Sequence, residues 1–191
     1  MEILRPNFVV GIGGSAGCLN AFMALLDALP SDTGMAFIFL SHLPFDAVSH
    51  LTEILSWHTK MPVMEAAKGM LIRPNHAYVL PPNADLSVEN YHFKIVSPRV
   101  VRNNQVDFFL ISLAESMGPR AIGIILSGYD GDGAEGCRHI KAKGGTTFAQ
   151  DGSAEVSGMP FSAQLTGCVD FVLPPDKIPD ELQRLLESAH S

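Results

Sequence analysis

Three polar residues, a serine, a histidine and an aspartate, each follow an apolar run of the sequence. Ser15, His42 and Asp132 come after the runs 8–12, 36–40 and 121–126. A nucleophile, a base and an orienting carboxylate are the residue types that acyl transfer needs within hydrogen-bond reach of one another. If the three runs are parallel strands, the residues that follow them emerge at one edge of the sheet. The spacing therefore favours a nucleophilic site there.

The serine lies in the pentapeptide 13–17, which has the form G-x-S-x-G. Small flanking residues permit a strained strand-to-helix turn that presents a serine hydroxyl. The helix that follows would point backbone N–H groups, that of Ala16 first, at a developing oxyanion. A glycine-rich turn without chemistry is the alternative interpretation.

The same glycines also permit a second interpretation. Gly11-x-Gly13-x-x-Ala16 resembles the dinucleotide fingerprint, in which glycines let a pyrophosphate approach a helix. That motif requires an acidic residue at the end of the second strand. The second run ends in Leu40-Ser41-His42, and Asp32 precedes it. The sequence therefore disfavours a dinucleotide site.

The segment 130–133 (Asp-Gly-Asp-Gly) superficially resembles a calcium loop. An EF-hand requires a third Asp or Asn where Ala134 stands, and a Glu where Lys141 stands. We therefore expect no metal site. One of the two aspartates, Asp130 or Asp132, is expected to orient His42, with glycines 131 and 133 allowing unusual backbone dihedrals.

Apolar runs alternate with segments of helical spacing along the chain. The strands are solid apolar runs, which is typical of a parallel sheet covered on both faces. The strands are expected at 8–12, 36–40, 121–126, 146–149 and 171–173, and the helices at 19–29, 47–58, 106–116, 134–143, 161–165 and 176–187. Two further strands, 77–80 and 93–96, are expected to form an antiparallel hairpin around Pro81-Pro82-Asn83. The sequence predicts one doubly wound α/β domain with a mostly parallel sheet.

Composition excludes several classes of protein. The 191 residues include 13 Lys and Arg against 20 Asp and Glu, for a net charge of −7, and no basic run. A nucleic-acid binder needs a basic face, so nucleic acid is not an expected partner. No stretch reaches the roughly 20 apolar residues of a membrane span, and no membrane insertion is expected. The three widely spaced cysteines suit a reducing cytoplasm.

Several motifs taken together resemble one family, the chemotaxis protein-glutamate methylesterases (CheB-type catalytic domain). The order and spacing of these motifs are specific as a set, and the similarity runs from about residue 8 to 186. The matching segments are 11–17, 41–44, 126–133, Gln150-Asp151, 158–160 and 172–174.

The resemblance implies hydrolysis of glutamate γ-methyl esters on chemoreceptor helices in chemotaxis signalling, with release of methanol. It implies Ser15 as the nucleophile, His42 as the general base and Asp132 as the orienting carboxylate. The backbone N–H of Tyr129 would help to bind the oxyanion. Some relatives also deamidate receptor glutamine. No cofactor is implied, because serine acyl transfer needs none.

Two features depart from the family pattern. Tyr129 stands where many members have Met, which leaves open a triad hydrolase of another ester. A non-catalytic module that binds receptors or nucleotides is the other alternative. The usual N-terminal receiver domain is not expected, because the first strand begins at Phe8. We expect residues 1–191 to form the catalytic domain, either alone or as a piece of a larger sensory protein.

Overall fold

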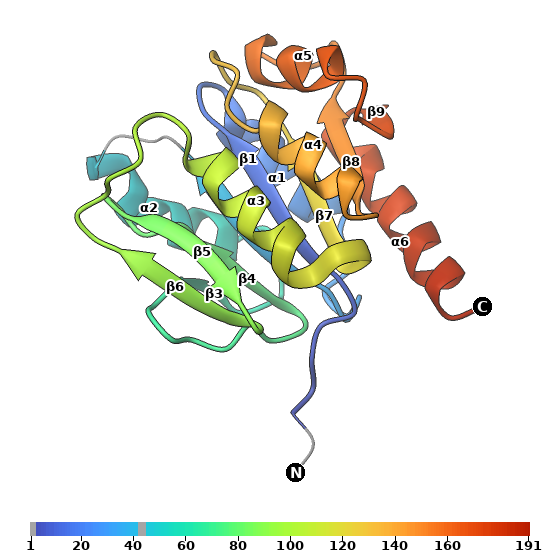
Figure 1. Cartoon of the computed structure of the whole chain (residues 1–191), viewed down its shortest axis with the longest axis horizontal. Helices are drawn as coiled ribbons and strands as arrows, with labels where there is room; N and C mark the ends of the chain where they lie inside the picture. The colour runs from blue at the N-terminus through green and yellow to red at the C-terminus, as the bar shows by residue number, and fades with distance from the viewer. Residues whose placement is uncertain (1–2, 42–44) are drawn as a thin grey trace.

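The structure is a computed structural model that describes residues 3–41 and 45–191, with side chains described outside 45–49. Its helices and strands alternate along most of the chain (Figure 1). The strands are β1 (Val9–Gly14), β2 (Ala36–Ser41), β3 (Val63–Glu65), β4 (His76–Val79), β5 (Asp85–Glu89), β6 (His92–Val96), β7 (Ala121–Ile125), β8 (Thr146–Gln150) and β9 (Phe171–Leu173). The helices are α1 (Cys18–Ala28), α2 (Phe45–Ser56), α3 (Gln105–Met117), α4 (Ala134–Ala142), α5 (Gly158–Leu165) and α6 (Ile178–Ala189), with short 3-10 turns η1 (Gly118–Arg120) and η2 (Pro175–Lys177).

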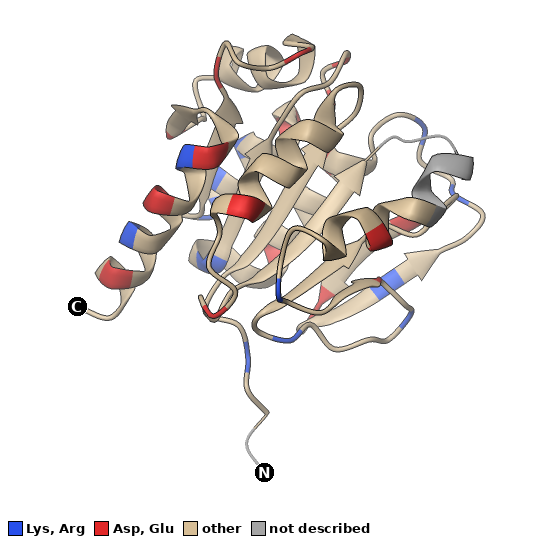
Figure 2. Cartoon of the chain, turned by 180° about the vertical axis from the view of Figure 1, so that it is seen from behind, with Lys and Arg blue, Asp and Glu red and all other residues tan. Residues whose placement is uncertain are grey.

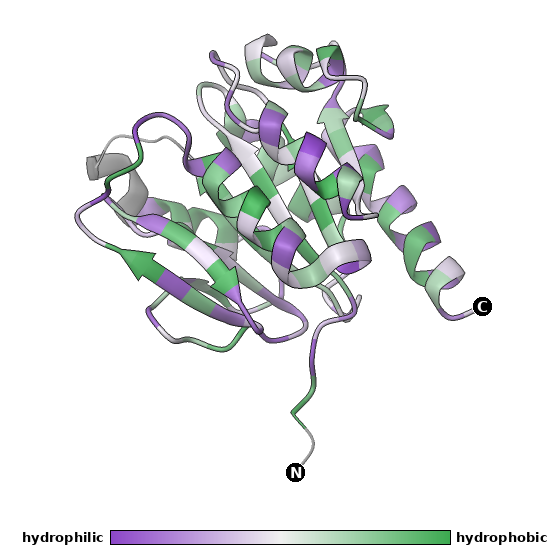
Figure 3. Cartoon of the chain, viewed as in Figure 1, coloured by the Kyte–Doolittle hydropathy of each residue, from purple (hydrophilic) through white to green (hydrophobic). Residues whose placement is uncertain are grey.

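In the part of the chain that the structure describes, seven strands form one parallel sheet in the order β3-β4-β2-β1-β7-β8-β9. β1, β2 and β7 are buried along their whole length, as solid apolar strands must be when helices cover both faces. Figure 3 shows the apolar residues concentrated in these central strands, whereas the helices alternate between polar and apolar faces. The predicted doubly wound α/β fold is confirmed.

Two apolar clusters lie on the two faces of the sheet. One joins α1, α2 and α6 to the sheet, and the other joins α3, α4, α5 and the β5-β6 hairpin to it. Figure 1 shows α3 and α4 in front of β1 and β7, and α1 behind them. The chain runs from β1 to β2 on one side and later crosses back to β7 on the other. The carboxyl ends of β1 and β7 therefore form a topological switch point, where sites of open α/β sheets lie.

The predicted hairpin is wrong in its first strand. Residues 77–80 largely belong to β4, which pairs in parallel with β2 and β3. The antiparallel partner of β6 is β5, and the two strands are joined through Asn90 and Tyr91. Both turn residues have positive φ, as the tightest hairpin turns require. Asn-Gly is the usual signal for such a turn, and here tyrosine stands in place of the glycine.

The glycines of β1 let α3 pack directly on the strand. A Cβ at Gly11 would lie 2.6 Å from the side chain of Leu110, and one at Gly13 would lie 2.4 Å from that of Val106. Contacts this short are not tolerated, so any larger residue would push α3 away from the sheet. The spacing that resembled a dinucleotide fingerprint thus sets the position of α3.

Candidate active site

Ser15 lies in the turn between β1 and α1, as predicted. Its backbone N–H donates to the carbonyl oxygen of Ser127, which follows β7 (2.9 Å). Gly17 closes the turn with φ of +74° and precedes the first residue of α1. This left-handed conformation is costly for residues with a side chain. The turn is therefore fixed at both ends, and the half-buried serine is held at the switch point.

A backbone donor meets the serine hydroxyl. The N–H of Tyr129 donates to Ser15 Oγ at 3.1 Å. The structure thus brings together two of the predicted site residues, which are 114 positions apart in the chain. At Ala16, the carbonyl oxygen accepts a hydrogen bond from Ser127 Oγ (2.7 Å). The participation of the Ala16 N–H in oxyanion binding stays a prediction.

Gly128 forms a wall of the site because it has no side chain. A Cβ at this position would lie 2.5 Å from Ser15 Oγ and 2.1 Å from Sδ of Met159, which is fully buried. The Gly128 backbone cannot withdraw easily, because its N–H donates to Val156 (2.9 Å) and its carbonyl accepts from Met159 (2.8 Å). Glycine is therefore required for Ser15 and Tyr129 to meet.

Ser127 organises the site, although its role was not predicted. Its side chain is fully buried, and its Oγ donates to Ala16 and accepts from the N–H of Val156 (2.9 Å). Its own N–H donates to Oε1 of the buried Gln150 (3.0 Å), at the end of β8. In the sequence, the only sign of this role is that two polar residues, Ser127 and Gln150, stand at the ends of two successive apolar runs. Ser127 thus ties the nucleophile turn to the loop after β8.

Asp132 is buried and receives two backbone hydrogen bonds from the first turn of α3. The N–H of Val106 donates to its Oδ2 (3.0 Å) and the N–H of Asp107 to its Oδ1 (2.8 Å). These N–H groups have no partner within the helix, so the carboxylate caps α3. The helix dipole also favours a negative charge at this end. The two hydrogen bonds therefore fix the carboxylate of Asp132 at the start of α3.

Asp130 differs from Asp132 in both exposure and contacts. It lies on the surface, and its Oδ1 accepts the N–H of Asp132 (3.0 Å) in a local turn. Gly133 has φ of +97°, so one of the two glycines that flank Asp132 has an unusual dihedral. Within the described residues, no group of three or more His, Cys, Asp or Glu could hold a metal ion.

His42 lies outside the described residues, so its predicted role as the base stays a prediction. The strand that leads to it ends at Ser41, which pairs with Gly14, the residue before the nucleophile. The chain therefore leaves β2 beside the turn that holds Ser15.

Burial shifts the pKa of two groups near the site. It raises the pKa of the Cys18 thiol to about 12, so Cys18, three residues from Ser15, is not a thiolate nucleophile at neutral pH. The pKa of the Asp107 carboxyl group is raised to about 6. Burial is the main cause, hydrogen bonds from Gly136 and Gly133 oppose it, and the charges of Asp132 and Glu135 add to it.

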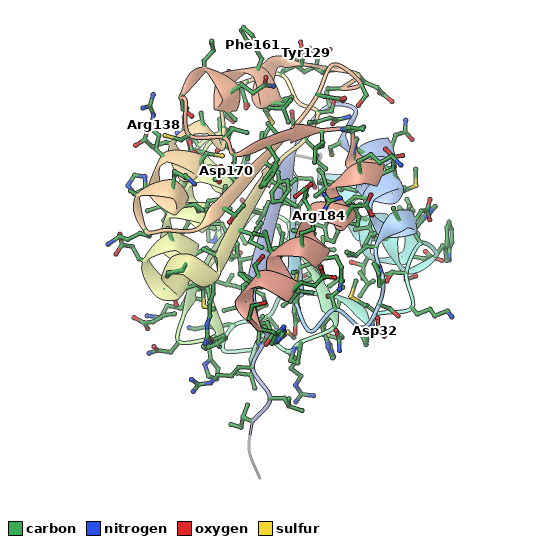
Figure 4. The ribbon with its side chains drawn as sticks, turned by 90° about the vertical axis from the view of Figure 1, so that its right-hand side faces the viewer. Asp32, Tyr129, Arg138, Phe161, Asp170 and Arg184 are labelled. Carbon is green, nitrogen blue, oxygen red and sulfur yellow. The ribbon has the colours of Figure 1, made fainter. Side chains whose placement is uncertain are left out.

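Two large side chains are exposed at the rim of the site. Tyr129 is 75% exposed, and Phe161, on the neighbouring α5, is 57% exposed. They lie at the same end of the molecule (Figure 4). Lysine and arginine residues are scattered over different elements rather than gathered at one place (Figure 2).

The comparisons with known proteins identify the family. Residues 10–182 match the family model described as CheB methylesterase. The chain belongs to the CheB methylesterase family. The predicted resemblance is confirmed. The crystal structure of the Thermotoga maritima CheB methylesterase catalytic domain superposes with a TM-score of 0.86 at 29% identity, covering 95% of this chain and all of that one.

Curated relatives carry the name protein-glutamate methylesterase/protein-glutamine glutaminase. The relative from Moorella thermoacetica is 32% identical over 97% of this chain and 46% of its own length. The relative from Xanthomonas euvesicatoria is 34% identical over 95% of this chain and 52% of its own length. The chain thus spans about half the length of these CheB-family relatives.

Proposed function

We propose that this chain is a serine esterase that hydrolyses glutamate γ-methyl esters on chemoreceptor helices and releases methanol. Ser15 is the nucleophile, His42 the general base and Asp132 the carboxylate that orients it. The proposal rests mainly on the hydrogen bond from Tyr129 N–H to Ser15 Oγ (3.1 Å), in a chain of the CheB methylesterase family. A preorganised backbone donor beside a serine hydroxyl is what an ester hydrolase needs for charge that develops on the carbonyl oxygen.

The reaction takes place in two halves. Ser15 Oγ attacks the ester carbonyl carbon while His42 accepts the hydroxyl proton, and the negative charge moves to the carbonyl oxygen. The backbone N–H of Tyr129 stabilises that oxyanion, with the N-terminus of α1 nearby. The intermediate expels methoxide, which leaves as methanol with the proton from His42. Water then attacks the acyl-enzyme by the same route, which frees glutamate and restores Ser15.

The same site supports hydrolysis of receptor glutamine. The printed names of the relatives include protein-glutamine glutaminase. The steps are the same, except that ammonia leaves in place of methanol. We propose deamidation as a second activity of this chain.

One observation favours a second candidate, an esterase for another ester. The side chain of Tyr129 is exposed on the residue that supplies the donor N–H, so a substrate bound at Ser15 would contact it. Tyrosine thus changes the rim of the site but leaves the backbone donor in place. A panel of methyl esters on peptides and small carboxylic acids tests this candidate against the receptor ester.

Release of methanol from radiomethylated receptor membranes tests the proposal directly. The parent chain should release labelled methanol, and the Ser15→Ala variant should not. A serine-directed fluorophosphonate separates an esterase from a non-catalytic binding module. Labelling of Ser15 supports the esterase, and a chain that neither reacts nor releases methanol is a binding module.

We place the reaction in the cytoplasm. The thiols of Cys18, Cys137 and Cys168 are free, which suits a reducing compartment. Across the described residues, none of the helices has the length and apolar character needed to cross a bilayer. Fractionation of cells with an antibody against this chain tests the location.

A further inference from the structure

The helices α3 and α4 exchange caps through two aspartates. Asp132, just before α4, accepts the N–H groups of Val106 and Asp107 in the first turn of α3. In return, Oδ1 of Asp107 accepts the N–H groups of Gly133 (2.9 Å) and Gly136 (2.7 Å) at the start of α4. Each helix is therefore capped by a carboxylate of the other segment.

The exchange holds Asp132 from two sides. The main chain of Asp107 donates to the carboxylate of Asp132, and the side chain of Asp107 fixes the peptide that joins Asp132 to Gly133. Gly133 has φ of +97°, and its Cβ position would lie 2.4 Å from Ile125. The backbone after Asp132 is therefore closely packed, and the Asp107 hydrogen bonds are among those that hold it.

We infer that Asp107 is a positioning residue of the esterase, which acts by fixing the backbone and carboxylate of Asp132. The inference rests on the proposed function, in which Asp132 orients His42. A displacement of about 1 Å in a group that positions the reacting atoms can cost about 10²-fold in rate.

The electrostatics of the pair distinguish the hydrogen bonds of Asp107 from its charge. Asp107 faces the carboxylate of Asp132 and, from α4, Glu135 and the thiol of Cys137, all of them acidic groups. Burial first, and then the charges of Asp132 and Glu135, raise the pKa of Asp107 to about 6, against the hydrogen bonds from Gly136 and Gly133 that lower it. Asp107 is therefore still charged at neutral pH, but its ionisation lowers the stability of the folded chain. Asn would accept the same N–H groups without that cost, so the positioning role belongs to the hydrogen bonds of Asp107 and not to its charge.

The test compares Asp107→Ala with Asp107→Asn, whose side-chain oxygen can still accept both N–H groups. We expect Asp107→Ala to lower kcat for methanol release at least about tenfold with KM within about twofold, because the loss lies in positioning and not in binding. Asp107→Asn should recover most of that loss. Glu135→Gln, which removes an exposed carboxylate from the same turn of α4, is the matched control and should behave like the parent.

A double-mutant cycle tests whether Asp107 acts through Asp132. In the Asp132→Asn background, Asp107→Ala should add less than about threefold, because the residue that it positions is already impaired. A full additional loss, or an Asp107→Ala variant within about twofold of the parent, overturns the inference. If Asp107→Ala does not fold, Asp107→Ser replaces it, and parental activity of that variant also overturns the inference.

The rate of fluorophosphonate labelling of Ser15 separates this inference from the proposed substrate. If the parent is labelled but releases no methanol, the receptor ester is the wrong substrate. The labelling rates of the Asp107 variants then replace kcat, with the same fold-changes deciding the role of Asp107. If the parent is neither labelled nor active, both the proposed function and the positioning role are refuted.

Discussion

Adding one methyl group at Gly128 should disable the site more than it destabilises the fold. A Cβ there would lie 2.5 Å from Ser15 Oγ and 2.1 Å from Sδ of Met159. Two hydrogen bonds hold the Gly128 backbone in place, and Met159 is fully buried. The serine hydroxyl is half-buried at the surface of the site, so it is the group with room to move.

The size of the effect follows from that geometry. Overpacking a well-packed site lowers the free energy of unfolding by about 1–3 kcal/mol. In a domain of this size, each kcal/mol lowers the melting temperature by roughly 2–4 °C. A shift of about 1 Å in the nucleophile costs about 10²-fold in rate. We therefore expect Gly128→Ala to lose at least about a hundredfold in kcat while it still folds cooperatively.

The assay is methanol release from radiomethylated receptor membranes, with thermal unfolding of each variant alongside it. Gly152→Ala is the matched control, because a Cβ at Gly152, in the loop after β8, would meet no atom within 4 Å. The control should stay within about twofold of the parent in both measurements. A folded Gly128→Ala variant with activity within about fivefold of the parent would refute the steric argument.

Four further predictions concern the proposed triad and its surroundings. The Ser15→Ala variant should lose several orders of magnitude in activity and keep the melting temperature of the parent. Loss of the nucleophile costs about 10⁶-fold in a well-studied protease, and a loss under about tenfold here would refute the assignment of Ser15. Asp132→Asn should lose at least about a hundredfold, and the exposed Asp130→Asn less than about tenfold; equal losses would move the assignment. Activity should rise with pH through about 6.5 as His42 becomes neutral, and a flat profile between pH 5 and 8, with chemistry rate-limiting, would contradict this role. Activity should also survive chelators and need no phosphoryl donor, and inhibition by EDTA that zinc reverses would contradict the absence of a metal. Because the folded pKa of Asp107 is raised to about 6, this group's contribution to the free energy of unfolding should fall as pH rises from about 4 through about 6, and Asp107→Asn should remove that part of the pH dependence measured by urea unfolding.

The parallel sheet could be predicted because its central strands are solid apolar runs. β1, β2 and β7 were predicted to within about two residues at each end, since burial on both faces leaves an unambiguous pattern. β3 has only three residues at the sheet edge, and β5 alternates polar and apolar residues over a short span. Such strands depend on partners that the local sequence does not specify.

The hydrogen bonds within the site could not be predicted from local sequence, because they join segments far apart in the chain. Ser127 contacts Ala16, which is 111 positions away, and Asp132 caps a helix that begins 27 residues earlier. Residue types identified Ser15 and the aspartate loop as chemically competent. The sequence could not show that Gly128 lines the serine or that Asp107 caps α4, because both roles arise from tertiary packing.

The glycines of β1 connect the nucleophile to the carboxylate through packing. Because Gly13 has no side chain, Val106 packs directly on the strand, two residues before Ser15. The N–H of Val106 in turn donates to Asp132, so the approach of α3 to β1 sets the distance between the two halves of the site. A larger residue at Gly13 would move α3, and the cap on Asp132 would move with it. The G-x-G spacing therefore serves the site through the position of α3.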